Sequence, residues 1–238
     1  MSTAERTQAV VAPVVRHGCR DAAAVVLAYV PFGVTLGATL ARTGVNPLTA
    51  WASSPLMFGG AAQLLSVQLL DAGANAIVVI LGALVVNARM LLYSASLAPH
   101  AGDWPARWRW AGAYLLADPV YAVAVARFSR PDRGGDGRVR LTYYLAVGLT
   151  FWVGWMGLTG AGALLAGVLP ASLSLELAAP LTFLLLLLPM LADRAAYAAA
   201  AVGGGVAVLA SGLPLGLGLL LGAAAGVTAG GLIGARHA

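Results

Sequence analysis

The sequence predicts an all-α protein, a polytopic transmembrane helical bundle of about eight spans in which Pro and Gly break several helices. Of its 238 residues, 60% are hydrophobic and only 10% are charged, whereas about a quarter of the residues in soluble domains are charged. The charges also leave long uncharged tracts at residues 43–70, 72–88, 141–175 and 195–235. One crossing of the hydrocarbon core needs about 20 apolar residues, so the last tract is long enough for two.

Turn residues divide the chain into hydrophobic segments. We expect spans near residues 21–41, 47–70, 75–98, 110–127, 141–169, 174–192, 194–211 and 213–234. The number falls to seven if one segment only dips into the bilayer. The expected organisation is a cytoplasmic N-terminal tail at 1–20, a single transmembrane transporter domain at 21–234 and a C-terminal tail at 235–238. Residues 1–20 contain no uninterrupted apolar run, so they do not read as a cleavable signal.

The basic residues predict the orientation. All 14 are Arg, and most flank the spans on one side. With the N-terminus inside, the cytoplasmic side receives ten of them and the outer side receives Arg42, Arg107 and Arg109. Because cytoplasmic loops carry an excess of positive charge, both termini are expected inside a multi-pass protein of the inner (plasma) membrane. The stretch from 99 to 109 is expected to be an interfacial loop anchored by Trp104 and Trp108.

Several expected spans contain helix breakers. Proline removes a helical hydrogen bond and frees a carbonyl, and lipid cannot satisfy that carbonyl. Broken helices therefore face protein or a wet cavity, and transporters build substrate sites from them. The breakers are Pro31, Pro55, Gly59, Gly60, Pro119, Pro180 and Pro189.

Arg89 is the clearest ionisable residue at membrane depth, and charge there is costly enough to suggest function. Asn87 and Tyr93 flank it; Arg89 and Tyr93 are four residues apart and share a helix face. A guanidinium matches the geometry of a carboxylate. The alternatives are a structural lock to another helix, or a side chain that extends to the interface.

Asp118 is the second such residue. It could pair with Arg89, carry a proton or attract a substrate ammonium, or it could simply cap the break at Pro119. Gln63 follows the Gly59-Gly60 break and could bind a ligand or another helix. Glu176 and Asp193 lie near segment ends, where capping or interfacial roles are favoured.

Enzyme chemistry is not predicted. His17, His100 and His237 lie at segment ends or in loops, so no buried His is expected to act as a base for Ser53, Ser54 or Ser94. There is no Lys, and hence no nucleotide-binding loop of the Gly-rich Lys-Ser/Thr type. Cys19 is a single thiol. We therefore expect no catalytic residue, no cofactor, no metal site and no nucleic-acid partner.

Short motifs resemble one family of transport proteins. They are Tyr-Val-Pro-Phe-Gly at 29–33, Phe-Gly-Gly-Ala-Ala-Gln at 58–63 and Val-Asn-Ala-Arg-Met-Leu-Leu-Tyr-Ser at 86–94. Asp118, Leu-Ala-Ala-Pro at 177–180, Asp193-Arg194 and Leu-Pro-Leu-Gly-Leu-Gly at 213–218 follow in the same order. The chain resembles the AzlC family, the large subunit of a two-component branched-chain amino acid exporter.

The resemblance implies export of valine, leucine, isoleucine and other aliphatic L-amino acids, driven by the proton gradient. It also implies a small AzlD-type partner of about four spans in the same lipid bilayer. Two departures matter. Met90 stands where the family usually has His, and Pro119-Val120-Tyr121 stands where it tends to have Glu-Thr-Phe, so an imidazole and a carboxylate are missing.

These features together suggest a substrate site. Arg89 would bind the amino acid carboxylate, and Asp118 would bind the ammonium or the coupled proton. The other expected substrate-binding residues are Asn87, Tyr93, Gln63, Gly59, Gly60 and Tyr121. The alternatives are a channel or importer for another small solute, and a scaffold subunit whose partner carries the pathway.

Overall fold

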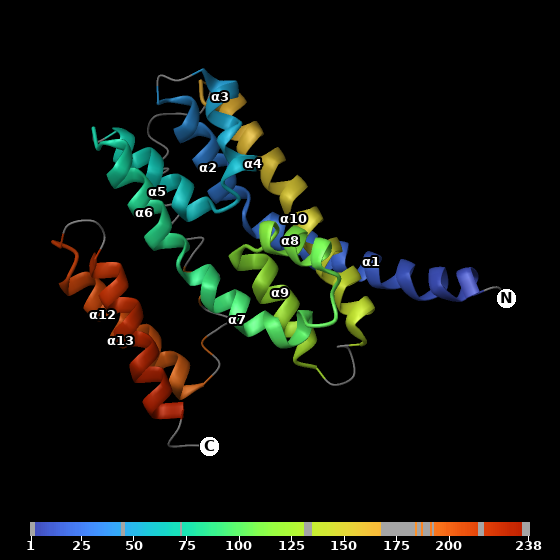
Figure 1. The fold of residues 1–238 in the computed structure, drawn as a ribbon. Helices are drawn as coiled ribbons and strands as arrows, with labels where there is room; N and C mark the ends of the chain where they lie inside the picture. The colour runs from blue at the N-terminus through green and yellow to red at the C-terminus, as the bar shows by residue number, and fades with distance from the viewer. Residues whose placement is uncertain are drawn as a thin grey trace.

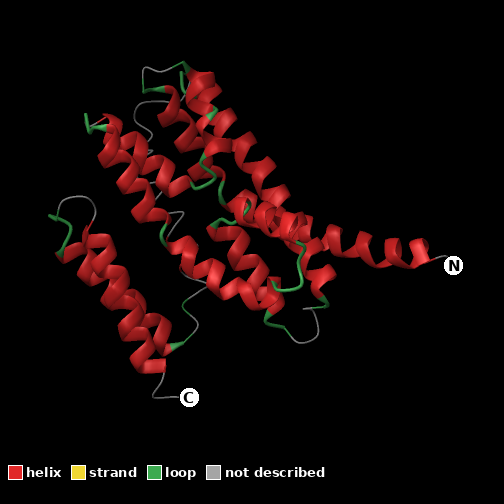
Figure 2. Ribbon diagram, in the orientation of Figure 1, coloured by secondary structure: helices red, strands yellow, loops and turns green. Residues whose placement is uncertain are grey.

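The computed structural model of the protein describes residues 3–43, 46–71, 73–130, 135–167, 184, 187, 191, 193–213 and 217–234. Within this part of the chain, all regular structure is helical and no strand occurs (Figure 2). The all-α class is therefore confirmed. The helices are α1 Thr3–Ala28, α2 Val30–Ala41, α3 Pro47–Trp51, α4 Ser53–Leu56, α5 Gly60–Asp71, α6 Ala76–Asn87, α7 Arg89–Ala101, α8 Ala106–Tyr114, α9 Asp118–Phe128, α10 Gly137–Leu165, α12 Arg194–Leu209 and α13 Leu217–Gly234.

Two helical stretches are long and apolar enough to cross a membrane, Ala76–Ala101 with 26 residues and Gly137–Leu165 with 29. At 1.5 Å per residue the shorter is roughly 39 Å long, more than the roughly 30 Å of hydrocarbon. A third candidate is the pair Val11–Ala28 and Val30–Ala41, bent by 60°. The expected number of about eight spans is not confirmed. The expected span at 174–192 lies outside the described residues except for Leu184, Leu187 and Leu191.

Helix breaks lie where Pro and Gly predicted them. α1 ends just before Tyr29, and Pro31 occupies the first turn of α2, where proline is tolerated because its missing N–H would be unpaired anyway. Residues 57–59 separate α4 from α5, and residues 115–117 separate α8 from α9. The expected span at 110–127 is thus two helices. The breakers Pro180 and Pro189 lie outside the described residues.

Short polar side chains begin several of the other helices. The side chains of Asn46, Asn75, Asp136 and Asp193 each accept a hydrogen bond from a backbone N–H two or three residues later. These bonds satisfy donors that a helix leaves free at its start. The capping role expected for Asp193 is confirmed, whereas Glu176 lies outside the described residues.

Helix α10 is the axis on which the first part of the chain packs. It lies against α2 and α1 over much of its length and also contacts α9 (Figure 1). Gly37 and Gly162 bring α2 and α10 together, because a side chain at either glycine would collide with the Thr159 or the Val34 carbonyl oxygen. Such small-residue crossings are the usual way in which membrane helices approach closely.

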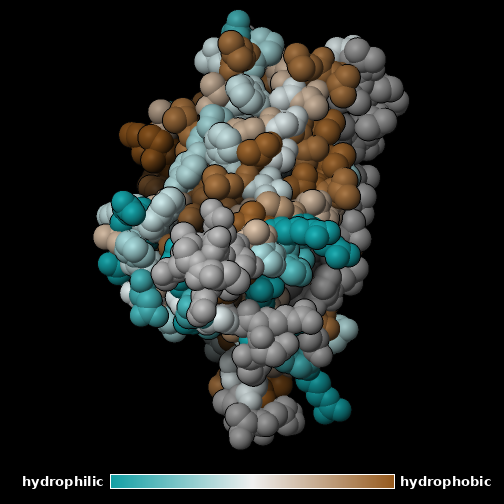
Figure 3. All heavy atoms as spheres, turned by 90° about the vertical axis from the view of Figure 1, so that its right-hand side faces the viewer, coloured by the Kyte–Doolittle hydropathy of each residue, from teal (hydrophilic) through white to brown (hydrophobic). Residues whose placement is uncertain are grey.

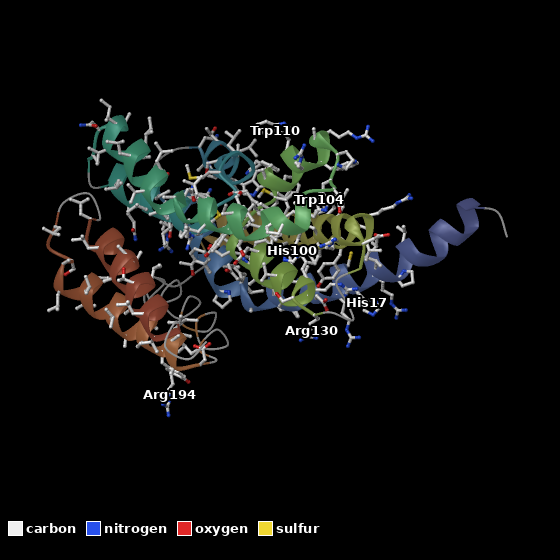
Figure 4. All side chains as sticks on the ribbon, turned by 60° about the horizontal axis from the view of Figure 1, so that its bottom comes forward. His17, His100, Trp104, Trp110, Arg130 and Arg194 are labelled. Atoms are coloured by element: carbon white, nitrogen blue, oxygen red, sulfur yellow. The ribbon has the colours of Figure 1, made fainter. Side chains whose placement is uncertain are left out.

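The segment expected to form an interfacial loop is mostly helical. Residues 99–101 complete α7 and residues 106–109 begin α8, so only residues 102–105 connect them. Trp104 is only 5% exposed and its ring centre lies 5.2 Å from that of Tyr144. Trp110 is 80% exposed and lies at the edge of the helices in Figure 4. Trp104 is therefore a core residue, and its ring packs the 102–105 connection against α10.

Helices α12 and α13 form a hairpin whose contacts are mainly with each other (Figure 1). Gly218, Gly222, Gly226 and Gly230 recur every fourth residue of α13. The last three face small residues of α12, and Gly218 faces Ala210 just after its end, so the two backbones touch. No residue of α12 is buried. Figure 3 shows one face of the molecule, on which hydrophobic side chains gather in the upper part and most hydrophilic ones in the lower half.

Candidate functional site

Three helix breaks meet at one small cavity. It is lined by Tyr29 at the α1–α2 break, by Gly59 at the α4–α5 break and by Ala117 and Asp118 at the start of α9. Its remaining walls come from α2, α5, α7 and α10. The aromatic side chains in the wall are those of Tyr29, Phe32, Phe58, Phe151 and Trp155. The arrangement matches the expectation that broken helices surround a common space.

The cavity has room for little more than one water molecule. Its volume is about 20 Å³, measured as the space open to the centre of a water-sized sphere. A single water needs roughly 10–15 Å³ on this measure. An amino acid therefore enters only if the surrounding helices move apart.

Asp118, in the wall of this cavity, forms an ion pair with Arg89, which lies beside the cavity and not in its lining. Arg89 Nη2 lies 2.8 Å from Asp118 Oδ2, and the two side chains are 30% and 27% exposed. The Tyr93 hydroxyl donates a hydrogen bond of 3.0 Å to Asp118 Oδ1. Arg89 and Tyr93 thus reach the same carboxylate from one face of α7, as their spacing predicted. Asp118 lies in the first turn of α9, and its two carboxylate oxygens contact Arg89 and Tyr93 of α7.

Tyr121 holds Tyr93 in place. Their rings stack with centres 4.2 Å apart and an interplanar angle of 11°. The Tyr121 hydroxyl donates to Ser96 Oγ at 3.0 Å. Stacking on one side and the bond to Asp118 on the other fix the Tyr93 ring, so Tyr121 acts on the ion pair through Tyr93.

Two buried donors at the cavity have no hydrogen-bond partner among the described residues. They are the Tyr29 hydroxyl and the Trp155 indole Nε1, on side chains that are 4% and 2% exposed. Arg89 Nε is likewise buried without a partner, and Arg89 Nη2, although close to Asp118, has no aligned hydrogen bond. Buried donors without acceptors are costly. A ligand that brings acceptor oxygens, such as a carboxylate, would satisfy them.

The missing side chain of Gly60 leaves space for the rings of Phe32 and Trp155 in the cavity wall. A β-carbon added to it would lie 2.7 Å from Phe32 Cε1 and 2.7 Å from Trp155 Cη2. Gly59 approaches Asn87 in the same way, since an added β-carbon would lie 3.2 Å from Asn87 Oδ1. Asn87 is the last residue of α6. It contacts the cavity-lining residue Gly59 but does not itself line the cavity.

Gln63 joins two helices through hydrogen bonds of its side chain. Its Nε2 donates to Ser53 Oγ at 2.7 Å and to Ser54 Oγ at 3.0 Å. The side chain is 2% exposed, and its Oε1 has no partner among the described residues. These bonds join α5 to α4, which is the helix-joining alternative considered for Gln63.

The sequence singled out Arg89, Asp118 and the glycines, but not Tyr29 or Trp155 as site residues. Tyr29 stood only inside a motif, and Trp155 lies in a long apolar helix between Gly154 and Met156, which are not polar. A tryptophan or tyrosine buried in a membrane still needs a partner for its polar atom. That requirement becomes visible only once the rings are placed.

Comparison with known proteins covers the part of the chain that holds this site. The profile of the family described as "AzlC protein" matches residues 24–169. The chain is 27% identical to the inner membrane protein YgaZ of Escherichia coli over 152 residues, which are 62% of this chain and 59% of that protein. It is 32% identical over 98 residues to an uncharacterized membrane protein of Helicobacter pylori strain J99, covering 41% of this chain and 42% of that one. The alignments thus span about half the length of these relatives.

No solved structure matches the chain. The matched region includes Arg89, Asp118 and every cavity wall residue, and it ends before the α12–α13 hairpin. The family profile covers more than half of the sequence, and the relatives are membrane proteins. The chain is a membrane protein that belongs to the AzlC family.

Proposed function

We propose that the protein is the large subunit of a proton-coupled exporter of branched-chain and other aliphatic L-amino acids. Residues 21–234 form its transporter domain, both termini are cytoplasmic, and a small AzlD-type subunit completes it. The observation that carries the proposal is the Arg89–Asp118 ion pair beside a cavity walled by aromatic rings. Membership in the AzlC family supports it.

The ion pair complements an amino acid. A zwitterion carries both a carboxylate and an ammonium. Its carboxylate can replace Asp118 as the partner of Arg89, and its ammonium can replace Arg89 as the partner of Asp118. Breaking a buried ion pair without such replacement is strongly unfavourable. Exchange with a zwitterion keeps both charges compensated during transport, whereas a neutral solute or a simple ion compensates at most one.

The unpartnered donors of the cavity-lining residues and of Arg89 favour a carboxylate. Tyr29 Oη, Trp155 Nε1 and Arg89 Nε all lack acceptors among the described residues. Hydrogen bonds to a charged acceptor are roughly twice as strong as neutral ones. A substrate carboxylate between these groups would therefore stabilise the occupied state.

The walls favour an apolar side chain. Apart from Asp118 and the polar atoms of Tyr29 and Trp155, the lining side chains are aromatic or aliphatic, including Met90. Such a pocket distinguishes substrates by only about 1–3 kcal/mol per methylene. Several aliphatic amino acids are therefore expected to compete for transport.

Asp118 is the group proposed to carry the coupled proton. Protonation would remove its attraction for Arg89 and leave the guanidinium free for the substrate carboxylate. His, which the family usually has after Arg89, is replaced here by Met90. This leaves the carboxylate as the candidate within the cavity wall.

The proposed partner would find ample apolar surface. In the stretch Ala76–Ala101, only 11% of the most apolar window is buried within the chain. The rest is available to lipid or to another subunit. Helices with little contact in their own chain are those expected to assemble with a second one.

The test is transport in vesicles that contain the protein with and without the partner. Vesicles loaded with radiolabelled valine should lose it faster when a proton gradient is imposed. Arg89→Ala should abolish the gradient-driven flux, while Arg109→Ala, which removes an exposed charge outside the cavity, should not. Full transport by Arg89→Ala would remove Arg89 from the site. Counterflow with a panel of solutes would reveal a channel or importer, and flux without any partner would exclude a scaffold role.

A further inference from the structure

A second charged cavity lies at the other end of α9. Asp118 begins α9, whereas Arg127 and Arg130 lie at and just beyond its end, roughly 14 Å further along at 1.5 Å per residue. This cavity is lined by Asp21 of α1, by Val123, Ala126, Arg127 and Arg130, and by Tyr143 of α10. Arg130 lies at the lower edge of the helices in Figure 4.

The second cavity is large enough for a small molecule. The space open to the centre of a water-sized sphere is about 290 Å³, against about 20 Å³ for the cavity at Asp118. Binding sites for small ligands begin at roughly 300 Å³. In the conformation described, an amino-acid-sized ligand thus fits at the end of α9 but not at its beginning.

Tyr143 organises the charges in this cavity. Its hydroxyl donates a hydrogen bond of 2.6 Å to Asp21 Oδ2. The guanidinium carbon of Arg127 lies 4.4 Å from the centre of the Tyr143 ring, at cation–π distance. The Tyr143 side chain is 1% exposed, so a rigid ring holds Asp21 at its edge and Arg127 over its face.

The opposite charges around this cavity are not paired with each other. No ion pair joins Asp21 to Arg127 or Arg130, and the ion pair seen among the described residues is Arg89–Asp118. Arg127 Nε is also buried without a hydrogen-bond partner in this part of the chain. A partly buried guanidinium without an anion is unfavourable. The cavity therefore presents both signs of charge to a ligand.

We propose that this cavity binds a small zwitterion, with an anionic oxygen group at Arg127 and Arg130 and a primary ammonium at Asp21. A simple anion would be repelled by Asp21, and a simple cation by two arginines. A free amino acid has the required chemistry, and so does the phosphate and ammonium of a phosphatidylethanolamine headgroup. The amino acid case rests on the proposed function and makes the cavity a waiting site for the solute; the lipid case does not.

Direct binding separates the two cavities. The parent protein for this experiment is the full chain in detergent with Asp118→Asn, a change that disables the site at the start of α9. Binding is measured as the rise in melting temperature that each ligand produces. The probes are L-leucine and dihexanoyl phosphatidylethanolamine. At least one probe should stabilise this parent. Adding Asp21→Asn or Arg130→Gln should weaken that binding about tenfold, since each removes one charged contact.

Arg138→Gln is the matched control, because it removes an exposed positive charge near the start of α10 and should leave binding unchanged. Binding of leucine assigns the cavity to the solute, and binding of the lipid alone assigns it to the headgroup. If Asp21→Asn does not fold, Arg130→Gln decides, because Arg130 is exposed. The proposal is overturned if neither probe binds the parent, if both bind the variants equally well, or if Arg138→Gln weakens binding as much. Absence of valine transport by the unmutated protein, with this binding intact in the Asp118→Asn parent, would instead count against the proposed function.

Discussion

A double-mutant cycle on Arg89 and Asp118 separates a structural lock from a substrate site. Arg89→Gln and Asp118→Asn each remove one charge while keeping a similar shape. The single variants leave the other charge without its partner in a site where both side chains are about 70% covered, since they are 30% and 27% exposed. The double variant leaves no charge uncompensated.

The expected stabilities follow from this burial. Breaking a fully buried pair costs about 3–5 kcal/mol, and breaking an exposed pair costs about 0–1 kcal/mol. For a pair of intermediate burial we expect each single variant to lose about 2 kcal/mol. The double variant should lose only about 1 kcal/mol, which corresponds to a coupling energy of about 3 kcal/mol. Unfolding by SDS in mixed micelles measures all four corners of the cycle.

Transport should follow a different pattern from stability. If the charges bind the substrate, all three variants should export valine at least tenfold more slowly than the parent, including the double variant whose stability is largely restored. If the pair only joins α7 to α9, the double variant should recover transport together with stability. Recovery of transport in the double variant would refute the substrate role.

Three further predictions concern the cavity and the helix packing. Gly60→Ala should reduce valine export at least tenfold in the vesicle assay, because its methyl group would force the Phe32 and Trp155 rings into a space that holds about one water. Trp155→Phe keeps a ring but removes the buried N–H, so the half-saturating valine concentration should rise about three- to tenfold; an unchanged value would contradict a role in binding. Gly162→Ala should lower the free energy of unfolding by about 1–3 kcal/mol, because the methyl group would meet the backbone of α2. Gly157→Ala, with no atom within 4 Å of the added carbon, should cause no such loss, because alanine is a better helix former than glycine; equal losses would contradict the close crossing.

The sequence alone determined where the helices lie and where several of them break. The expected spans 75–98 and 141–169 overlap the helical stretches Ala76–Ala101 and Gly137–Leu165, because hydrocarbon requires apolar side chains and internally paired backbone. Pro31 and Pro119 marked helix beginnings because proline lacks the N–H that a helix interior needs. The spacing of Arg89 and Tyr93 fixed their common face. These properties are local, so a single sequence displays them.

Only the tertiary structure decided which side chains meet. Three contacts join residues that are far apart in the sequence or lie in different helices. Asp118 contacts both Arg89 and Tyr93, Gln63 donates a hydrogen bond to Ser53, and Tyr29 and Trp155 line the same cavity. The pattern of apolar residues on a membrane helix does not identify its neighbours, because lipid and protein are equally apolar surroundings. The partners are chosen instead by close contacts such as that of Gly37 with α10, and by the need of each buried charge and donor for a partner.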